Sequence, residues 1–224
     1  MLLFSVVLFH QLTLRIATVE ITRNNITRPV YKALSIVGIS VHELSHLLLC
    51  VLFKHRIDEV KLFTLKSNTN IAGFVKHTWN QDSTYQNIGC FFIALAPLIT
   101  SISIVYASFV HSQNTMPIDV LIDLTKSPLG FGKLLLVSSI VFHCIPSLQD
   151  LKNAMKSALS LAVPIIVIAI IIYYGILFNY IDLDLEYRNI ITLTVNTTTC
   201  VITLSQMFIW VSYLLIKLTK EKDQ

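Results

Sequence analysis

The apolar residues of this chain fall into long blocks that are separated by short polar stretches. A block of roughly 17 to 25 apolar residues has the length that crosses about 30 Å of hydrocarbon as a helix. The blocks cover about residues 1–17, 31–53, 87–110, 129–145, 161–180 and 198–218. The pattern predicts an all-α polytopic membrane protein with about six transmembrane helices.

The first block is open to two interpretations. His10, Gln11 and Arg15 interrupt it, so it is either a weak first span or a signal peptide. It lacks the basic start and the small-residue cleavage site of a signal peptide, which favours a retained helix.

The polar stretch between the second and third blocks has a different pattern. The short runs VKLFTL and IAGFV are rich in β-branched and aromatic residues, and the turn-rich stretch KSNTN separates them. This pattern predicts a short β-hairpin near the membrane surface. After the fourth block, SLQDLKNAMKSAL is predicted to be an amphipathic helix.

Composition supports a membrane protein. Hydrophobic residues make up 54% of the chain and charged residues 13%, and the mean hydropathy is +0.69, well above the balance of a soluble domain. No repeat, low-complexity tract or shift in composition marks a second domain. We therefore expect a single integral membrane domain over residues 1–224, with the lipid bilayer as its surroundings.

The basic residues indicate an orientation. Lysines and arginines follow the second, fourth and sixth blocks, which places these segments on the cytoplasmic side. The basic loop 15–32 is the exception. The net charge of +4 is explained by such flanks, and because no basic stripe is interleaved with aromatic residues, we expect no nucleic-acid partner.

The cysteines and most histidines suggest no chemistry. Each of the four cysteines stands alone in an apolar block without CxxC spacing, so we expect small core residues and neither disulfides nor a thiolate zinc cluster. His77 is interpreted as an interfacial polar residue. His10, His55 and His111 lie at interruptions or ends of blocks and receive no role.

The second block contains HELSH, three ionisable side chains in an otherwise apolar run. On a helix, His42 and His46 project from one face, so both imidazoles can reach one metal ion, while Glu43 lies beside the open coordination position. A zinc ion with three protein ligands keeps a position for water, and Glu43 can take a proton from that water. The alternative is that the three side chains only hydrogen-bond to neighbouring helices.

A third ligand must come from elsewhere in the chain. HCIPSLQDLKNA follows the fourth block, and its Asp150 is a hard oxygen ligand at a point where Pro146 interrupts a helix. His143 competes with it, either as a metal ligand or as a hydrogen-bond donor to a developing oxyanion. The alternatives are a solvated aspartate at a helix start and a buried structural histidine.

Together, HELSH, ALAPLITS and CIPSLQDL resemble the three ordered motifs of the site-2 protease family of intramembrane zinc metalloproteases. The stretches HELSHLLLCVLFKHRIDEVKLF, GFVKHTWN and YQNIGCFFIALAPLI are particularly similar to small bacterial membrane metallopeptidases of this class. The sequence departs from the family pattern at three positions: Ala96 replaces a glycine, Thr100 replaces an asparagine, and Leu151 stands where a glycine follows the aspartate.

The resemblance implies a function. His42, His46 and Asp150 would bind one Zn²⁺ per chain, and Glu43 would be the general base, within a catalytic core of about residues 31–156. The substrate would be a membrane protein or peptide, held in extended form by the hairpin. The resemblance also implies a bacterial cell membrane, and the basic segments place the active site toward the cytoplasm. A membrane metal transporter and a non-catalytic relative that binds a membrane partner are the alternatives, and no feature of the sequence indicates an oligomeric state.

Overall fold

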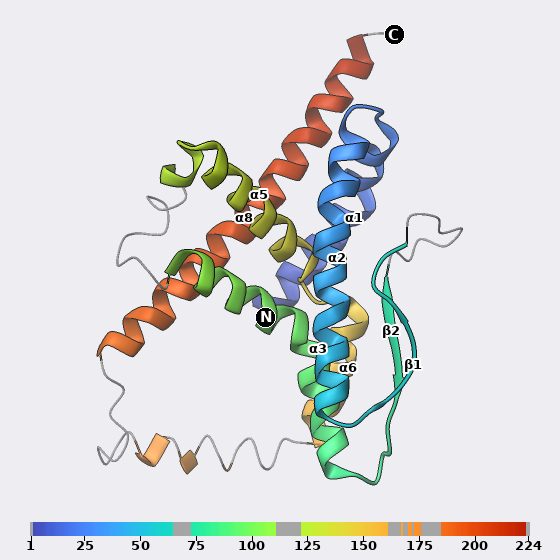
Figure 1. The fold of residues 1–224 in the computed structure, drawn as a ribbon, viewed down its shortest axis with the longest axis vertical. Coiled ribbons are helices and arrows are strands. Elements are labelled where there is room, and N and C mark those ends of the chain that lie inside the picture. The colour runs from blue at the N-terminus through green and yellow to red at the C-terminus, as the bar shows by residue number, and fades with distance from the viewer. Residues whose placement is uncertain are drawn as a thin grey trace.

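The computed structural model describes residues 2–64, 73–110, 122–160, 167, 170–171, 173–175 and 185–222, and these are mostly helical (Figure 1). In chain order the elements are α1 (Leu2–Arg23), α2 (Thr27–Leu52), β1 (Arg56–Lys61), β2 (Phe74–Thr78), α3 (Thr84–Val105), a π-helical turn (Tyr106–Val110), α5 (Pro128–His143), α6 (Leu148–Ser160) and α8 (Leu185–Lys222). The hairpin expected between the second and third blocks is confirmed.

Helix α2 lies at the centre of the described structure, in contact with α3, α5 and both strands. Helix α8 crosses behind α5 and runs beside α1 (Figure 1). Two apolar clusters hold these helices together. One joins α3, the π-helical turn, α5 and α8, and the other joins α1, α5 and α8. The first contains Val105, Phe109, Val137, Val141 and Val201, and the second contains Ala17, Ile21, Phe142, Ile209 and Ile216.

Six membrane spans are not confirmed. Among the described residues, three helices are long and apolar enough to cross a membrane: Thr27–Leu52, Thr84–Phe109 and Asn189–Thr219. The pair Pro128–His143 and Leu148–Ala158, bent by 58°, adds a fourth if the two helices count as one span. The first block is helical, as α1, but does not meet the same test, and most of the fifth block, 161–180, lies outside the described residues.

The outer surfaces of the helices that are long enough to cross a membrane are apolar. Leu48 on α2 is 61% exposed and Phe208 on α8 is 62% exposed, and many large apolar side chains on these helices are exposed to a similar degree. Surface of this kind is unfavourable in water and is expected where lipid tails surround a helix. The described helices therefore indicate a membrane-associated protein.

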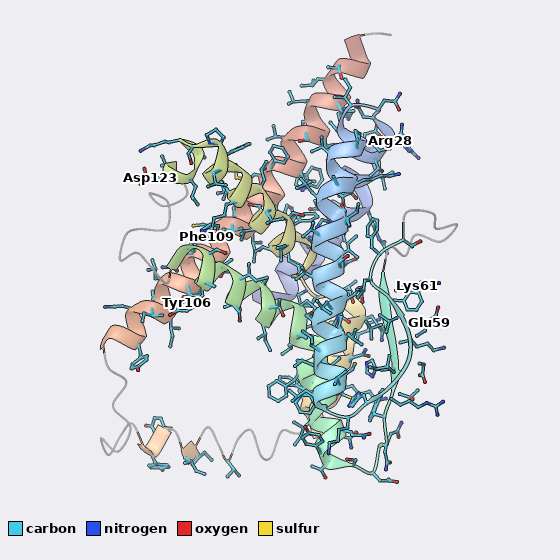
Figure 2. All side chains as sticks on the ribbon, viewed as in Figure 1. Arg28, Glu59, Lys61, Tyr106, Phe109 and Asp123 are labelled. Atoms are coloured by element: carbon cyan, nitrogen blue, oxygen red, sulfur yellow. The ribbon has the colours of Figure 1, made fainter. Side chains whose placement is uncertain are left out.

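The hairpin strands begin and end at other residues than the apolar runs suggested. The runs VKLFTL and IAGFV cover residues 60–65 and 71–75, whereas the strands pair over 56–61 and 74–78. Val60 pairs with Val75 and Ile57 with His77, with an irregularity in register between Ile57 and Glu59. Glu59 and Lys61 project from the outer side of the hairpin, away from α2 (Figure 2). Backbone pairing with β2 therefore sets the extent of β1, and the charged residues in RIDEVK are accommodated on its exposed surface.

Buried polar contacts join α1 to α8. The Nε2 group of Gln206 lies 2.9 Å from Nδ1 of His10, and the indole of Trp210 donates a hydrogen bond of 3.0 Å to the hydroxyl of Thr13. Both His10 and Gln206 are buried. These contacts pair polar groups between two apolar helices, whereas Oε1 of Gln206 is buried without a hydrogen-bond partner among the described residues.

Candidate metal centre

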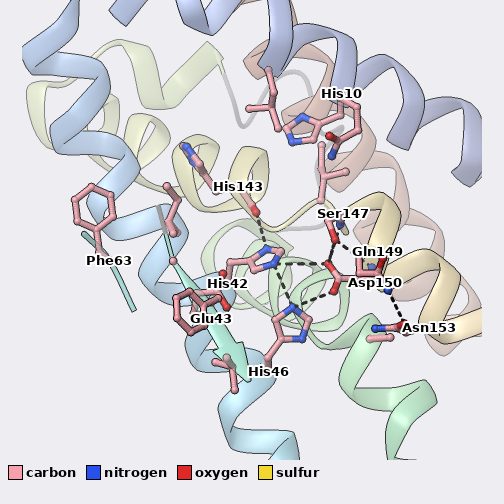
Figure 3. Close-up of a pocket in the computed structure, with 18 of the residues that line it drawn as sticks. His10, His42, Glu43, His46, Phe63, His143, Ser147, Gln149, Asp150 and Asn153 are labelled. Atoms are coloured by element: carbon pink, nitrogen blue, oxygen red, sulfur yellow. Dashed lines mark hydrogen bonds and ion pairs between the residues drawn. The ribbon is translucent and has the colours of Figure 1, made fainter. Parts of the chain in front are cut away.

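Helix α2 places His42 and His46 side by side, one turn apart, as the HELSH spacing predicts. Their Nε2 atoms are 3.2 Å apart, and the imidazole rings meet edge to face with centroids 4.8 Å apart (Figure 3). The region around HELSH contains no helix-breaking residue, so a continuous helix carries both side chains.

The remaining nitrogen of each ring faces a main-chain carbonyl. Nδ1 of His42 is 2.7 Å from the carbonyl oxygen of His143, and Nδ1 of His46 is 2.7 Å from that of Ile93. A carbonyl oxygen can only accept a hydrogen bond, so the proton of each neutral ring belongs on Nδ1. Both Nε2 atoms then point lone pairs at each other.

Two facing lone pairs repel unless a cation lies between them. Two imidazole nitrogens bound to one tetrahedral zinc ion are about 3.3 Å apart, close to the 3.2 Å found here. The spacing therefore fits a shared metal ion, and a hydrogen bond between the two rings would instead require one of them to carry a proton on both nitrogens.

The two carbonyls are available for identifiable reasons. His143 is the last residue of α5, where carbonyls have no partner further along the helix. Ile93 lies four residues before Pro97, and because proline has no N–H group, the Ile93 carbonyl receives no hydrogen bond from that position. Because of Pro97 in the ALAPLITS motif, the Ile93 carbonyl is available to accept a hydrogen bond from Nδ1 of His46, which orients the ring.

Asp150 completes the group. Its Oδ2 lies 3.9 Å from Nε2 of His42, and its Oδ1 lies 3.8 Å from Nε2 of His46. The three ligand atoms all lie within 4.8 Å of one another. Two imidazoles and one carboxylate are a donor set that zinc accepts in catalytic sites.

The carboxylate of Asp150 is fixed by the start of α6. The N–H and hydroxyl groups of Ser147 donate hydrogen bonds of 2.8 and 2.6 Å to its Oδ2, and the N–H of Asp150 lies 3.1 Å from the Ser147 hydroxyl oxygen. This reciprocal pattern is a capping box, which stabilises a helix N-terminus. Capping and ligation are compatible here, because capping uses Oδ2 and leaves Oδ1 facing His46 (Figure 3).

The ring of His143 lies outside this group. Its Nδ1 is 2.8 Å from the Ser139 carbonyl within α5, and its Nε2 is buried without a hydrogen-bond partner in the part of the chain that the structure describes. Figure 3 shows the ring directed away from His42, His46 and Asp150. The structure therefore brings the backbone carbonyl of His143 to the site, rather than the side chain that the sequence offered as a ligand or oxyanion donor.

Glu43 lies beside the three potential ligands and faces the hairpin. It is 8% exposed and lies beside the backbone of Val75 in β2. Gly73 allows this close approach, since a Cβ at that position would lie 2.9 Å from Cγ of Glu43 and 2.8 Å from the Leu62 carbonyl oxygen. Glu43 and the three potential ligands border a cavity of about 1480 Å³ that α1, α2, α3, α6 and the hairpin also line.

A second group of potential ligands was not expected from the sequence. Cys50, His55 and His77 also place their ligand atoms within 4.8 Å of one another. The sequence interpretation assigned Cys50 to the core, left His55 without a role and placed His77 at the membrane interface. The sequence offered one local signal for this group, a cysteine five residues before a histidine at a helix end. His77 could not be added from the sequence, because its position depends on the register between the two strands.

Comparison with family models, curated proteins and solved structures gives no match for this chain. The resemblance to site-2 proteases therefore rests on the three motifs. The structure places all three around one centre: HELSH supplies His42 and His46, ALAPLITS contains Pro97, which leaves free the carbonyl that orients His46, and CIPSLQDL supplies Asp150.

Proposed function

We propose that this chain is an intramembrane zinc metalloprotease that hydrolyses a peptide bond in or near a transmembrane segment of its substrate. The observation that carries the proposal is that the Nε2 atoms of His42 and His46 lie 3.2 Å apart, with Asp150 facing both atoms and Glu43 beside them. A purely structural histidine pair would not need both rings to be held in the same metal-binding tautomer.

His42, His46 and Asp150 would hold the zinc ion. When bound, zinc supplies Lewis acidity and lowers the pKa of an attacking water toward about 7. The Ser147 hydroxyl and the carbonyls of Ile93 and His143 keep the three ligands in place. Such outer contacts fix ring orientation and tautomer before the metal arrives.

Glu43 is the general base in this proposal. Its carboxylate takes a proton from the attacking water and then donates that proton to the nitrogen of the leaving amine, as the peptide C–N bond breaks. The carboxylate is not a ligand and is free for proton transfer. It lies beside the backbone of Val75, in the strand that faces the site.

Strand β2 is suited to hold the substrate. A peptide bond within a helix is shielded by its own backbone hydrogen bonds, so a substrate helix must be unwound before water can attack. An extended segment can then add to a strand edge through main-chain hydrogen bonds. We propose that β2 receives the substrate in this way beside Glu43, in a multi-pass protein whose site faces the cytoplasm, as the positions of the basic segments favour.

The test compares cells that carry either the wild type or Glu43→Gln as their only copy of this chain. Mass spectrometry of protein N-termini from the membrane fraction would detect cleavage products from any membrane substrate. We expect N-termini inside or next to transmembrane segments that are present with the wild type and absent with Glu43→Gln. Identical sets of N-termini at equal protein levels would contradict the proposal.

A membrane metal transporter is the second candidate. The observation that favours it is that His46 and His77, which belong to two different groups of potential ligands, line the same cavity. The two proposals differ in their dependence on Glu43. Zinc flux into proteoliposomes that persists in Glu43→Gln would favour transport, whereas the protease proposal expects no flux above that of empty liposomes.

A further inference from the structure

The end of α2 brings Cys50 and His55 together. The N–H of His55 bonds to the carbonyl of Cys50 at 2.9 Å, and the N–H of Lys54 bonds to that of Val51 at 3.1 Å. Lys54 has a φ of 56°, in the left-handed region. These features form a Schellman motif, which folds the chain back over the last turn of a helix. The motif therefore holds the His55 side chain beside Cys50, which is fully buried.

Strand β2 brings His77 to the same place. His77 pairs with Ile57, two residues beyond His55, and its Nδ1 lies 3.0 Å from Nδ1 of His55. Two nitrogens bound to one tetrahedral zinc ion are about 3.3 Å apart, so little adjustment is needed. The three residues therefore come from two segments that meet only in the folded chain.

The surroundings fix the His55 ring. Nε2 of His55 donates to the carbonyl of Gln86 at 2.9 Å, which leaves the lone pair on Nδ1, the atom that faces His77. The indole of Trp79 stacks on the His55 ring with centroids 5.8 Å apart and also contacts His77. This is the outer support that metal-binding histidines commonly have.

A third donor, the sulfur of Cys50, makes the group suited to zinc, which accepts mixed thiolate and imidazole ligands.

We propose that Cys50, His55 and His77 bind a second zinc ion, separate from the one at His42, His46 and Asp150, and that this ion fastens the hairpin to the end of α2. On binding, the Cys50 thiol releases its proton to solvent and its sulfur forms the bond to zinc. The ion would join α2 directly to β2, the strand whose residue Val75 contacts Glu43. Its role would be structural, because it would hold the strand beside Glu43.

The thiolate makes the second site distinguishable from the first. Co²⁺ replaces zinc in many sites, and a Co²⁺–thiolate bond gives a charge-transfer absorption that a site of two histidines and one aspartate cannot give. The experiment uses detergent-purified full-length protein that is stripped with a chelator and reloaded with Co²⁺ alone. Bound cobalt per chain and the thiolate absorption are measured for wild type, Cys50→Ser, His77→Gln and His46→Ala. Cys200→Ser is the control, because Cys200 is a cysteine on α8 that belongs to neither group of potential ligands.

We expect two cobalt ions per chain and the thiolate absorption in the wild type and in Cys200→Ser. Cys50→Ser and His77→Gln should each bind one ion, with no thiolate absorption in Cys50→Ser and at least tenfold weaker binding at this site in His77→Gln. His46→Ala should bind one ion and keep the thiolate absorption. His77 is only partly buried, so His77→Gln tests the site even if Cys50→Ser fails to fold.

Two results would overturn the proposal: no thiolate absorption in folded wild-type protein, or an unchanged absorption in Cys50→Ser. In both cases Cys50 would be a buried core residue, and His55 and His77 a hydrogen-bonded pair. The two proposals can fail separately. If the wild type bound one cobalt ion without thiolate absorption, the second site would be excluded, while the site at His42, His46 and Asp150 would remain. His46→Ala also tests whether the ion fastens the hairpin to α2, because cobalt can then bind only at Cys50, His55 and His77. In this variant, amide hydrogen exchange in residues 74–78 should slow by tenfold or more when cobalt is added.

Discussion

At the scale of single residues, the candidate centre depends on which ring nitrogen carries each proton. Two main-chain carbonyls, those of His143 and Ile93, place the protons of His42 and His46 on Nδ1 and direct both Nε2 lone pairs to one point. The side chains of the motif would be present without these carbonyls, but each ring could then rotate or change tautomer. Tautomer control by the backbone is therefore the feature that would prepare HELSH to bind a metal ion.

Glu43→Gln separates catalysis from metal binding. The amide keeps the size of the side chain but cannot accept the proton, so we expect cleavage to fall by about 100- to 10,000-fold while the metal content stays at the wild-type value. Cleavage is measured with a substrate identified by its Glu43-dependent N-terminus. Glu59→Gln, on the outer side of the hairpin, is the control. Cleavage at near wild-type rate in Glu43→Gln would refute the assigned role.

Pro97→Ala tests the carbonyl that orients His46. Alanine restores an N–H that can bond to the Ile93 carbonyl within α3 and so competes with Nδ1 of His46. We expect metal affinity at the first site to fall by about 10- to 100-fold, the usual effect of losing an outer-shell contact, with little loss of helix stability. Competition against a metal-binding dye measures the affinity.

Pro128→Ala is the matched control for that substitution. Pro128 lies at the start of α5, where the missing N–H of proline leaves no carbonyl of the same helix without a partner. An equal loss of affinity in both variants would show that the effect of Pro97→Ala does not pass through the Ile93 carbonyl.

At the scale of elements, the site depends on how closely α2 approaches its neighbours. Gly38 lies where α2 meets α5, and the Ser139 hydroxyl donates a hydrogen bond of 2.7 Å to the Leu34 carbonyl at the same contact. A Cβ at Gly38 would lie 2.5 Å from Nδ1 of His143 and 2.7 Å from the Ser139 carbonyl oxygen. The short distance between α2 and α5 is what allows the His143 carbonyl to reach His42.

Gly38→Ala should therefore push α2 and α5 apart. We expect a loss of stability of about 1 to 3 kcal/mol, typical of overpacking, together with weaker metal binding as the His143 carbonyl withdraws from His42. Thermal unfolding in detergent and metal titration measure the two effects. Gly132→Ala is the control, because a Cβ there meets nothing within 4 Å. Equal stability and metal affinity in the two variants would contradict this view of the interface.

Lys54→Gly tests the turn that ends α2. Lys54 occupies the left-handed region, with φ of 56°, which glycine adopts without the steric cost that other residues bear. We expect Lys54→Gly to raise stability by about 1 kcal/mol, measured as a higher unfolding midpoint at equal metal loading. Lys54→Ala removes the same side chain but keeps the steric cost, so it should stay near the wild type. A lower midpoint in Lys54→Gly than in Lys54→Ala would argue against the assigned turn.

At the scale of the whole molecule, hydropathy predicted the helical character, because long apolar blocks leave few other options in a membrane. The β-branched and aromatic runs on either side of a turn-rich stretch predicted the hairpin. Spacing on one helix also placed His42, Glu43 and His46 together. The sequence pattern did not fix the strand bounds, since charged RIDEVK becomes a strand only by pairing with β2. It also missed the group of Cys50, His55 and His77, which depends on the turn at Lys54 and on strand register. For His143, the pattern pointed to the ring, whereas the structure uses its carbonyl.

The metal content of purified protein tests the central claim most directly. Elemental mass spectrometry would compare zinc per chain in the wild type, His46→Ala and Asp150→Ala, each shown to be folded in detergent. We predict that both variants lose one zinc ion per chain relative to the wild type, because both residues belong to the same three-ligand group. Zinc contents equal to that of the wild type in both variants would contradict a metal centre at His42, His46 and Asp150, and with it the proposed protease.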